Sequence, residues 1–427
     1  MTAWLRMAAA SAWARRGTLV WVIVAIAIAT ALLLAIERLR HDVRASFLQA
    51  VSGTDLIVGA RTGPVQLLLY SVFRVGGASN EVRLEALDEA LQHRAVAWWV
   101  PLALGDSHRG YPVLGTTTGY FEHFRYGDRQ PLALAQGRPF AGTLDGLYEA
   151  TIGADVAARL GYAPGQKIVL AHGLPGQGSG PMAEHADKPF TVVGVLARTG
   201  TPVDRTVHVS LEAITAIHLD WMGGAPVPGF AIPAEAARKF DLAPKTVTAA
   251  LVGLKSRSAV FMVQRQVQAY EGEPLMAVLP GVALDELWQA IAIVEQALLA
   301  VSALVALAGI AGLVAVVQAG LAERRRELAV LRAIGAGRRV MLGLLAAEGL
   351  WIASAGVAAG VLLALLAQTA AGPWLHANYG IALVGAAPWS GQALLLLAVW
   401  VAAMLAAVAP GWRACRMALA DGLAPRA

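Results

Sequence analysis

Four long apolar stretches constrain this chain more than any other feature of its sequence. A membrane span needs about 20 mostly apolar residues, and residues 19–36, 297–317, 342–367 and 393–408 meet that requirement. Hydrophobic residues make up 57% of the chain and charged residues 15%, whereas soluble proteins average roughly 45–50% and 25%. We therefore expect a membrane protein, with one span before a long polar segment and three spans after it.

The first apolar stretch has some features of a cleavable signal peptide. Arg15 and Arg16 precede it, and it contains small residues such as Ala25 and Ala27. However, its apolar run is longer than the 7–15 residues usual for a signal peptide, and it ends in leucines. A retained span is the preferred interpretation.

Basic residues in the short connecting segments predict the orientation in the membrane. The segment between the second and third spans is rich in arginine, whereas residues 372–391 contain no Lys or Arg. The N-terminal and C-terminal segments are also basic. Because short cytoplasmic loops carry an excess of Lys and Arg, all three basic segments should be cytoplasmic. Residues 37–290 should then lie outside the cytoplasm.

These observations predict a layout in nine parts. The expected parts are a cytoplasmic N-terminus (1–18), a first span (19–36), an external α+β domain with stalk segments (37–290), a stalk and second span (291–320), a cytoplasmic coupling helix (321–340), a third span (341–367), a short external loop (368–392), a fourth span (393–409) and a cytoplasmic C-terminus (410–427).

The external segment mixes strand and helix signals. Residues 190–196 and 207–210 are rich in β-branched residues, which is typical of strands. Residues 151–160 predict a strand end followed by a short helix, residues 167–171 predict a strand, and residues 82–93 have helical spacing. The approach to the second span, residues 284–296, is amphipathic and predicts a helical stalk. The sum indicates a mixed α+β domain.

The Gly- and Pro-rich loop at residues 171–188 carries three potential metal ligands, His172, His185 and Asp187. Two imidazoles and a carboxylate suit a divalent metal, and an external metal-binding receptor is one hypothesis. The spacing of thirteen residues between the histidines matches no compact metal motif. A solvated loop with scattered histidines is the alternative, and no metal centre is assigned.

Most catalytic chemistry has no counterpart in the sequence. No phosphate-binding loop of the G-x-x-x-x-G-K-[ST] type is present, and no hydrolase or zinc-protease motif occurs, so we expect neither catalysis nor a bound cofactor. The single Cys415 excludes an internal disulfide. Residues 37–290 hold 22 Lys and Arg against 24 Asp and Glu, and the remainder holds 12 against 5. Positive charge in the hydrophobic parts suits lipid headgroups and argues against nucleic-acid binding.

One acidic residue lies within the third apolar stretch. Glu348 falls about two turns into the third span. Ionisable residues in a membrane are costly and are often functional, but a snorkelling or inter-helix hydrogen-bonding role is the preferred interpretation. A secondary transporter usually places several acids at mid-membrane, so this one carboxylate and four spans disfavour that class.

The cytoplasmic segment between the second and third spans predicts a short amphipathic helix. Leu328, Leu331 and Ile334 recur every three residues, and Gly335 ends the pattern. Such a helix can lie in the headgroups as a basic anchor or dock into a groove of a partner protein. Its acidic residues, Glu323 and Glu327, suit a partner protein better than an anionic lipid surface.

This segment resembles the signature of the FtsX/MacB-type permeases of ABC transporters, which include the lipoprotein-releasing permeases. The resemblance rests on Glu323-Arg324-Arg325-Arg326-Glu327 followed by Leu331-Arg332-Ala333-Ile334-Gly335-Ala336. Residues 151–161, 165–169 and 190–196 are similar to stretches of the family's periplasmic core domain. The ending at residues 410–418 resembles the family's C-terminus, which usually reads Pro-Ala where this chain has Pro-Gly. The family's topology is the one predicted above.

The resemblance implies a mechanism and a set of partners. Two copies pair in a bacterial inner membrane, and each docks its coupling helix on a separate ATPase subunit that binds ATP and Mg²⁺. ATP binding then moves the periplasmic domains, which act on a lipoprotein, a small molecule or another external partner. The implied coupling residues are Glu323, Arg324, Arg325, Arg326, Glu327, Leu328, Leu331, Arg332 and Gly335, of which the three consecutive arginines could instead only anchor the helix to lipid.

Two further segments have expected packing roles. Gly356 and Gly360 form a small-xxx-small pattern that allows close helix contact and hence dimerisation. Residues 64–75 form a dense apolar run that resembles a segment of a less characterised branch of the family, and we expect it to pack beside the stalk or else to form an interfacial patch. As an alternative to transport, the chain could be a transmembrane regulator that activates a cell-wall hydrolase, as the cell-division member of the family does.

Overall fold

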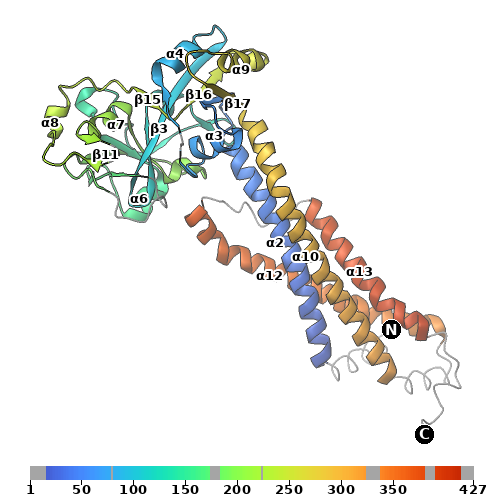
Figure 1. Ribbon diagram of the computed structural model, residues 1–427. Coiled ribbons are helices and arrows are strands. Elements are labelled where there is room, and N and C mark those ends of the chain that lie inside the picture. The colour runs from blue at the N-terminus through green and yellow to red at the C-terminus, as the bar shows by residue number, and fades with distance from the viewer. Residues whose placement is uncertain are drawn as a thin grey trace. The chain divides into compact units, whose positions relative to one another are not determined.

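The computed structural model describes residues 16–77, 80–173, 183–222, 225–323, 337–379 and 390–414. It divides the chain into two compact units. The helical unit comprises the described residues within Met1–Asp42, Ala292–Trp374 and Leu383–Ala427, and the external domain comprises those within Val43–Ile291 and Leu375–Ala382. Both units are drawn in Figure 1.

Apolar helices make up the helical unit. They are α2 (Arg16–Gln49), α10 (Pro280–Glu323), α12 (Arg338–Tyr379) and α13 (Ser390–Ala414). Among the described residues, three stretches are long and apolar enough to cross a membrane: Leu19–Asp42, Pro280–Gly312 and Ala346–Leu375. A shorter apolar stretch, Gln392–Ala406, falls in α13. One apolar helix therefore precedes the external domain and the others follow it, as the sequence predicts.

Small residues bring α12 close to α2 within the helical unit. A Cβ atom built on Gly360 would lie 2.6 Å from Thr30 Cβ and 2.7 Å from the Ala27 carbonyl oxygen, and one on Gly356 would lie 2.7 Å from Ile26. Without a hydrophobic drive between helices in lipid, such close backbone approach is a main source of packing energy. These glycines therefore bring α12 close to α2 inside one chain, and their role in dimerisation stays a prediction.

The external domain is built around a mixed sheet. The order of strands among the described residues is β17-β1-β16-β3-β4-β12-β8-β11-β7, with β10 beside β3 and β9 beside β11. The strands of this sheet are β1 (Leu56–Ala60), β3 (Val96–His108), β4 (Tyr111–Thr116), β7 (Leu134–Gly137), β8 (Glu149–Ile152), β9 (Lys167–Ile168), β10 (Ala171–His172), β11 (Phe190–Leu196), β12 (Val207–Ser210), β16 (Ala249–Leu254) and β17 (Leu275–Val278). Two pairs, β12 with β4 and β8 with β11, are parallel, and the other pairs are antiparallel.

Shorter elements complete the domain. The two-stranded pairs are β2 (Val82–Arg83) with β15 (Thr246–Val247), β5 (Arg125–Tyr126) with β6 (Gln130–Pro131), and β13 (Trp221–Met222) with β14 (Ala225–Pro226). The helices are α3 (Pro64–Ser71), α4 (Leu84–Leu91), α5 (Gly119–His123), α6 (Ala154–Leu160), α7 (Leu211–Ile217), α8 (Ala234–Ala237) and α9 (Val260–Gln268). Single 3₁₀ turns occur at Leu144–Gly146, Pro202–Arg205 and Arg257–Ala259.

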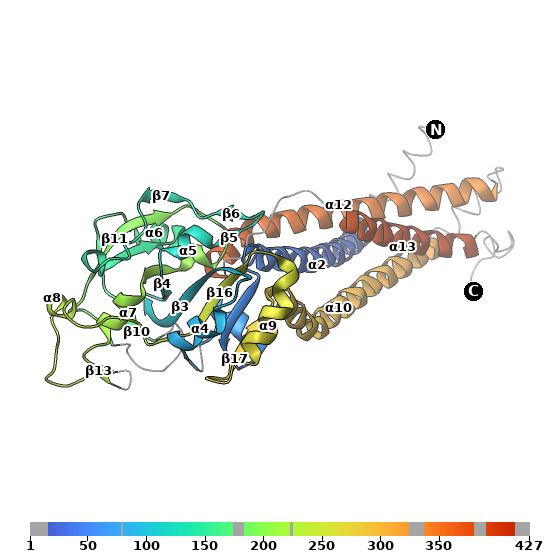
Figure 2. The ribbon, with the colours of Figure 1, turned by 90° about the horizontal axis from the view of Figure 1, so that it is seen from above.

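The strands at one end of the sheet are buried on both faces. In β1, Ile57 faces a core with α3, whereas Leu56 and Val58 face a second core with α4 and α9. Successive strand side chains point to opposite faces, which explains why β1 is a continuous apolar run. Figures 1 and 2 both show α4 and α9 side by side over this end of the sheet. A third core lies around β8, β11 and β12, where α6 and α7 pack.

Several predicted elements have the predicted bounds. The strands over residues 190–196 and 207–210 are β11 and β12, and residues 151–160 form the end of β8 and then α6. Residues 82–93 contain α4 after the two-residue β2, and the strand expected over residues 167–171 is shorter, ending at Ile168. A mixed α and β external domain is confirmed.

The apolar run at residues 64–75 packs beside the stalk, as expected. The Phe73 ring stacks on Phe47 at 4.2 Å between centroids, and Phe47 meets the Trp288 ring edge-on at 5.6 Å. Arg44 lies over the same Trp288 ring and reaches Asp285 at 3.5 Å. The last residues of α2 and the first turns of α10 are therefore held together, within the external domain, by an aromatic cluster.

Candidate functional site

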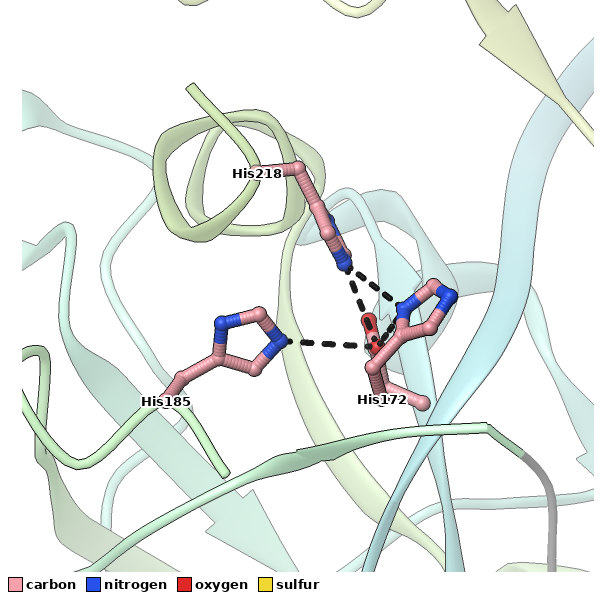
Figure 3. A group of neighbouring side chains, drawn as sticks. His172, His185 and His218 are labelled. Carbon is pink, nitrogen blue, oxygen red and sulfur yellow. Dashed lines mark hydrogen bonds and ion pairs between the residues drawn. The ribbon is translucent and has the colours of Figure 1, made fainter. Parts of the chain in front are cut away.

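A cluster of one carboxylate and three imidazoles lies in the external domain. Its members are Asp106, His172, His185 and His218, whose potential ligand atoms all lie within 4.8 Å of one another. Figure 3 shows the three imidazoles pointing toward one another around the carboxylate. Residues from three distant parts of the sequence therefore form one site, which we call the Asp–His cluster.

The central sheet positions the first two members. Asp106 lies in β3, where the register against β4 shifts between Leu104 and Ser107. Such bulges redirect side chains and are common next to functional sites. The two-residue strand β10 pairs antiparallel with β3, placing His172 directly opposite Asp106. Cross-strand partners share one face of a sheet, so His172 Nδ1 lies 3.2 Å from Asp106 Oδ1.

His185 is held by backbone pairing on the other side of β10. The backbone N–H of His172 donates to the Ala183 carbonyl at 2.9 Å, and the N–H of His185 donates to the Leu170 carbonyl at 2.8 Å. The segment at residues 183–185 thus extends the pairing past β10 and turns the His185 ring toward Asp106. The ring is 0% exposed, and its Nε2 lies 3.9 Å from Asp106 Oδ1.

His218 immediately follows α7. The Ser210 hydroxyl caps this helix by accepting from the N–H of Ala213, and α7 ends at Ile217. His218 Nδ1 lies 2.8 Å from the carbonyl oxygen of Ile214, so that nitrogen donates a hydrogen bond back to the helix. The other nitrogen, Nε2, lies 3.4 Å from Asp106 Oδ1 and 3.0 Å from His172 Nδ1.

Burial and the imidazoles have opposing effects on Asp106. Burial by itself raises the pKa of this carboxyl, but the nearby imidazoles of His172, His185 and His218 outweigh burial, and the pKa falls below its usual range. Burial lowers the pKa of His218, and the contacts with Asp106 and Ile214 raise it by more. The carboxylate is therefore ionised and needs positive charge beside it.

A buried ion pair connects the two segments that carry His185 and His218. The Lys188 ammonium, fully buried, lies 2.9 and 2.8 Å from the two oxygens of Asp220 and 2.7 Å from Asp187 Oδ2. Asp220 also accepts from the N–H of Ile232 at 2.9 Å. Lys188 follows His185 closely and Asp220 follows His218 closely, so this ion pair ties the two segments that present those histidines.

Of the three predicted metal ligands, two lie in the Asp–His cluster and one does not. His172 and His185 do come together, although the sequence spacing matched no motif. Asp187, the predicted carboxylate, contacts Lys188 and is 44% exposed; it is not in the cluster. Asp106 and His218 were missed because they lie 66 and 46 residues from His172 along the chain. A histidine directly after an apolar helix pattern was the one available signal, and it is a weak one.

The predicted coupling residues lie almost entirely outside the described structure. Glu323 is the last residue of α10. Arg324, Arg325, Arg326, Glu327, Leu328, Leu331, Arg332 and Gly335 fall in residues 324–336, outside the described residues. Glu348 lies in α12, near the start of its apolar stretch. The roles of all these residues stay predictions.

Comparisons with known proteins place the chain in a family. A model of the MacB-like periplasmic core domain matches residues 18–270, and a model of the FtsX-like permease C-terminal region matches residues 299–419. No curated protein matches the chain by sequence.

Two solved structures of external domains are similar to part of the chain. The periplasmic region of MacB from Actinobacillus actinomycetemcomitans is 11% identical, with a TM-score of 0.32, and the match covers 57% of this chain and 97% of that one. The extracellular domain of the noncanonic ABC-type transporter YknZ from Gram-positive bacteria is 13% identical, with a TM-score of 0.29, covering 52% and 98%. Both scores are below 0.5, so the relationship rests on the family models. The model of the MacB-like periplasmic core domain matches more than half of this chain. The chain therefore belongs to the FtsX/MacB-like family of ABC transporter permeases.

Proposed function

We propose that this chain is the transmembrane subunit of an ABC system in the inner membrane, and that it transmits movement to its external domain. A separate ATPase subunit would bind ATP and Mg²⁺ in the cytoplasm, and two copies of this chain would pair. The substrate or partner would be met on the periplasmic side or within the membrane. The match to both family models carries this proposal.

The sequence supports a division of labour between two chains. It contains no phosphate-binding loop of the kind that ATPases use. Such an energy source would therefore have to dock on the cytoplasmic side. The segment at residues 323–335 offers charged residues and an apolar stripe there, which is the pattern of a helix that lies in a groove of a partner.

Helix α10 offers a direct mechanical link. Its helical residues run from Pro280 in the external domain to Glu323 in the helical unit. Its first turn follows β17 closely, and Ala283 and Leu284 are buried in the core beside α3. The same helix ends where the predicted coupling segment begins. A displacement at the cytoplasmic end would therefore act on the base of the external domain.

Co-purification tests this proposal. The full chain, tagged and solubilised from native membranes in mild detergent, should bring down a stoichiometric ATP-binding subunit by mass spectrometry. Hydrolysis by that subunit should depend on this chain. If the chain purifies without a nucleotide-dependent partner, the proposal is wrong.

A matched pair of variants tests the coupling segment. E327A/R332A should uncouple ATP hydrolysis from the chain while leaving membrane insertion unchanged. The control R416A/D421A removes one acidic and one basic residue from the predicted cytoplasmic C-terminus and should leave coupling intact. Wild-type coupling in E327A/R332A would exclude these two residues from the docking site. Recovery of a cell-wall hydrolase with the external domain would favour the regulator alternative over transport.

A further inference from the structure

We propose that Asp106, His172, His185 and His218 form a binding site for an exchangeable divalent transition-metal ion, with Zn²⁺ the best fit. This site is independent of the permease function proposed above. It rests on the donor set, on the separations between donor atoms and on a buried imidazole that has no hydrogen-bond partner among the described residues.

The donor set selects the class of metal. Imidazole nitrogens and a carboxylate oxygen are the usual ligands of Zn²⁺, whereas Ca²⁺ and Mg²⁺ require mostly oxygen ligands. Zn–N and Zn–O bonds of about 2.0–2.2 Å place tetrahedral ligands roughly 3.3–3.6 Å apart. The separations from Asp106 Oδ1 are 3.2 Å to His172, 3.4 Å to His218 and 3.9 Å to His185. All four donor atoms lie within 4.8 Å of one another, so shifts of about 1 Å would let them surround one ion.

The hydrogen bond to the helix prepares His218 for a cation. Because Nδ1 donates to the Ile214 carbonyl, the neutral ring carries its lone pair on Nε2. That atom faces Asp106 Oδ1 and His172 Nδ1. A backbone carbonyl that holds the second nitrogen of a ligating histidine is the usual outer support of a zinc site.

His185 provides the independent observation. It is completely buried, and neither of its ring nitrogens has a hydrogen-bond partner among the described residues. Buried polar atoms without partners are rare, and a bound ion is one accepted explanation. Its Nε2 points at the Asp106 carboxylate, while the Trp221 ring covers the imidazole at 4.1 Å between centroids. A metal ion is the partner that this nitrogen lacks.

Exposure predicts that the ion exchanges with solvent. The side chains of His172 and His218 are 35% and 25% exposed, whereas those of Asp106 and His185 are buried. The site therefore has two deep ligands and two at its mouth. The rival occupant is a proton, which would turn His218 into an imidazolium paired with the buried carboxylate.

The test measures Zn²⁺ binding by the full chain in detergent, purified with a tag that contains no histidine. After a chelator strips the protein, Zn²⁺ is titrated in competition with a chromophoric chelator, and elemental analysis counts the bound ions. We expect one Zn²⁺ per chain, released and rebound without unfolding. D106N and H172A should weaken binding by about a hundredfold or more, since even outer-shell changes cost 10–100-fold. Co²⁺ in the same site should show the intense visible absorption of tetrahedral coordination.

Two controls make the result decisive. H93A/H123A removes two partly exposed histidines of the same domain that are not in the cluster, and it should leave binding unchanged. H172A carries the test if D106N does not fold, because His172 lies at the mouth of the site. Absence of stoichiometric Zn²⁺, or binding that survives both D106N and H172A, would overturn the proposal and leave the cluster as a protonated ion pair. Neither outcome bears on the ATPase partner.

Discussion

Replacing Lys188 with Met should destabilise the external domain strongly. The Lys188 ammonium is fully buried and contacts both oxygens of Asp220, which is itself 4% exposed. Methionine has a similar length and no charge, so the K188M variant would leave the Asp220 carboxylate buried without its cation. The N–H of Ile232, which donates to Asp220, would be its main remaining support.

The magnitude follows from the burial of the pair. Removing one partner of a buried ion pair costs about 3–5 kcal/mol because the other charge stays uncompensated. For a domain of this size, each kcal/mol lowers the melting temperature by about 2–4 °C. We therefore expect a melting temperature lower by about 6–20 °C. The partly exposed Asp187 adds little to this figure, because solvent screens exposed pairs.

The assay is thermal unfolding of the full chain in detergent, followed by intrinsic tryptophan fluorescence. K239M makes the same chemical change at an exposed lysine and should have no effect. The double variant K188M/D220N should recover part of the lost stability, since it removes the uncompensated charge. The Zn²⁺ affinity of K188M should also fall, because Lys188 and Asp220 brace the segments that carry His185 and His218.

Two results would refute this reasoning. If K188M melts within about 2 °C of the wild type, a shift that corresponds to less than 1 kcal/mol, the Lys188–Asp220 contact is solvated and does not hold the domain together. If K188M/D220N is less stable than K188M, the loss comes from packing and not from the stranded carboxylate.

Two further predictions concern packing in the helical unit and pH. G360A should lower the stability of the detergent-solubilised chain by about 1–3 kcal/mol, because the new Cβ would overlap Ala27 and Thr30. In the control G312A the new Cβ meets open space, so this variant should melt at or above the wild-type temperature. Burial, together with the charge of Arg74, lowers the pKa of His208 to about 3 in the folded chain. As the pH drops below about 6.5, His208 therefore binds a proton in the unfolded chain but not in the folded one, and the stability of the fold decreases. Between pH 8 and pH 5 the wild type should lose about 2 kcal/mol more than H208N, measured by melting temperature at both values; equal losses would show that His208 is not the group responsible.

The sequence by itself predicted a membrane topology and identified the long apolar helices and many local elements. The length of an apolar stretch and the positions of arginines are properties of the sequence alone, so they can be read without any knowledge of tertiary contacts. The strands β11 and β12 and the helix α6 were predictable for the same reason, since β-branched runs and helical spacing are local signals. The family resemblance likewise rests on short contiguous segments.

Only the tertiary structure decided how the Asp–His cluster is composed. Asp106 and His218 join His172 through strand pairing, a β-bulge and the end of a helix. Asp187, the predicted carboxylate ligand, contacts the Lys188 ammonium instead. Similarly, the spacing of Gly356 and Gly360 predicts close helix contact, but only the structure shows that the helix packed against them is α2 of the same chain. Pairing between distant segments depends on which strands and helices meet, and the local pattern of one segment does not identify its partner.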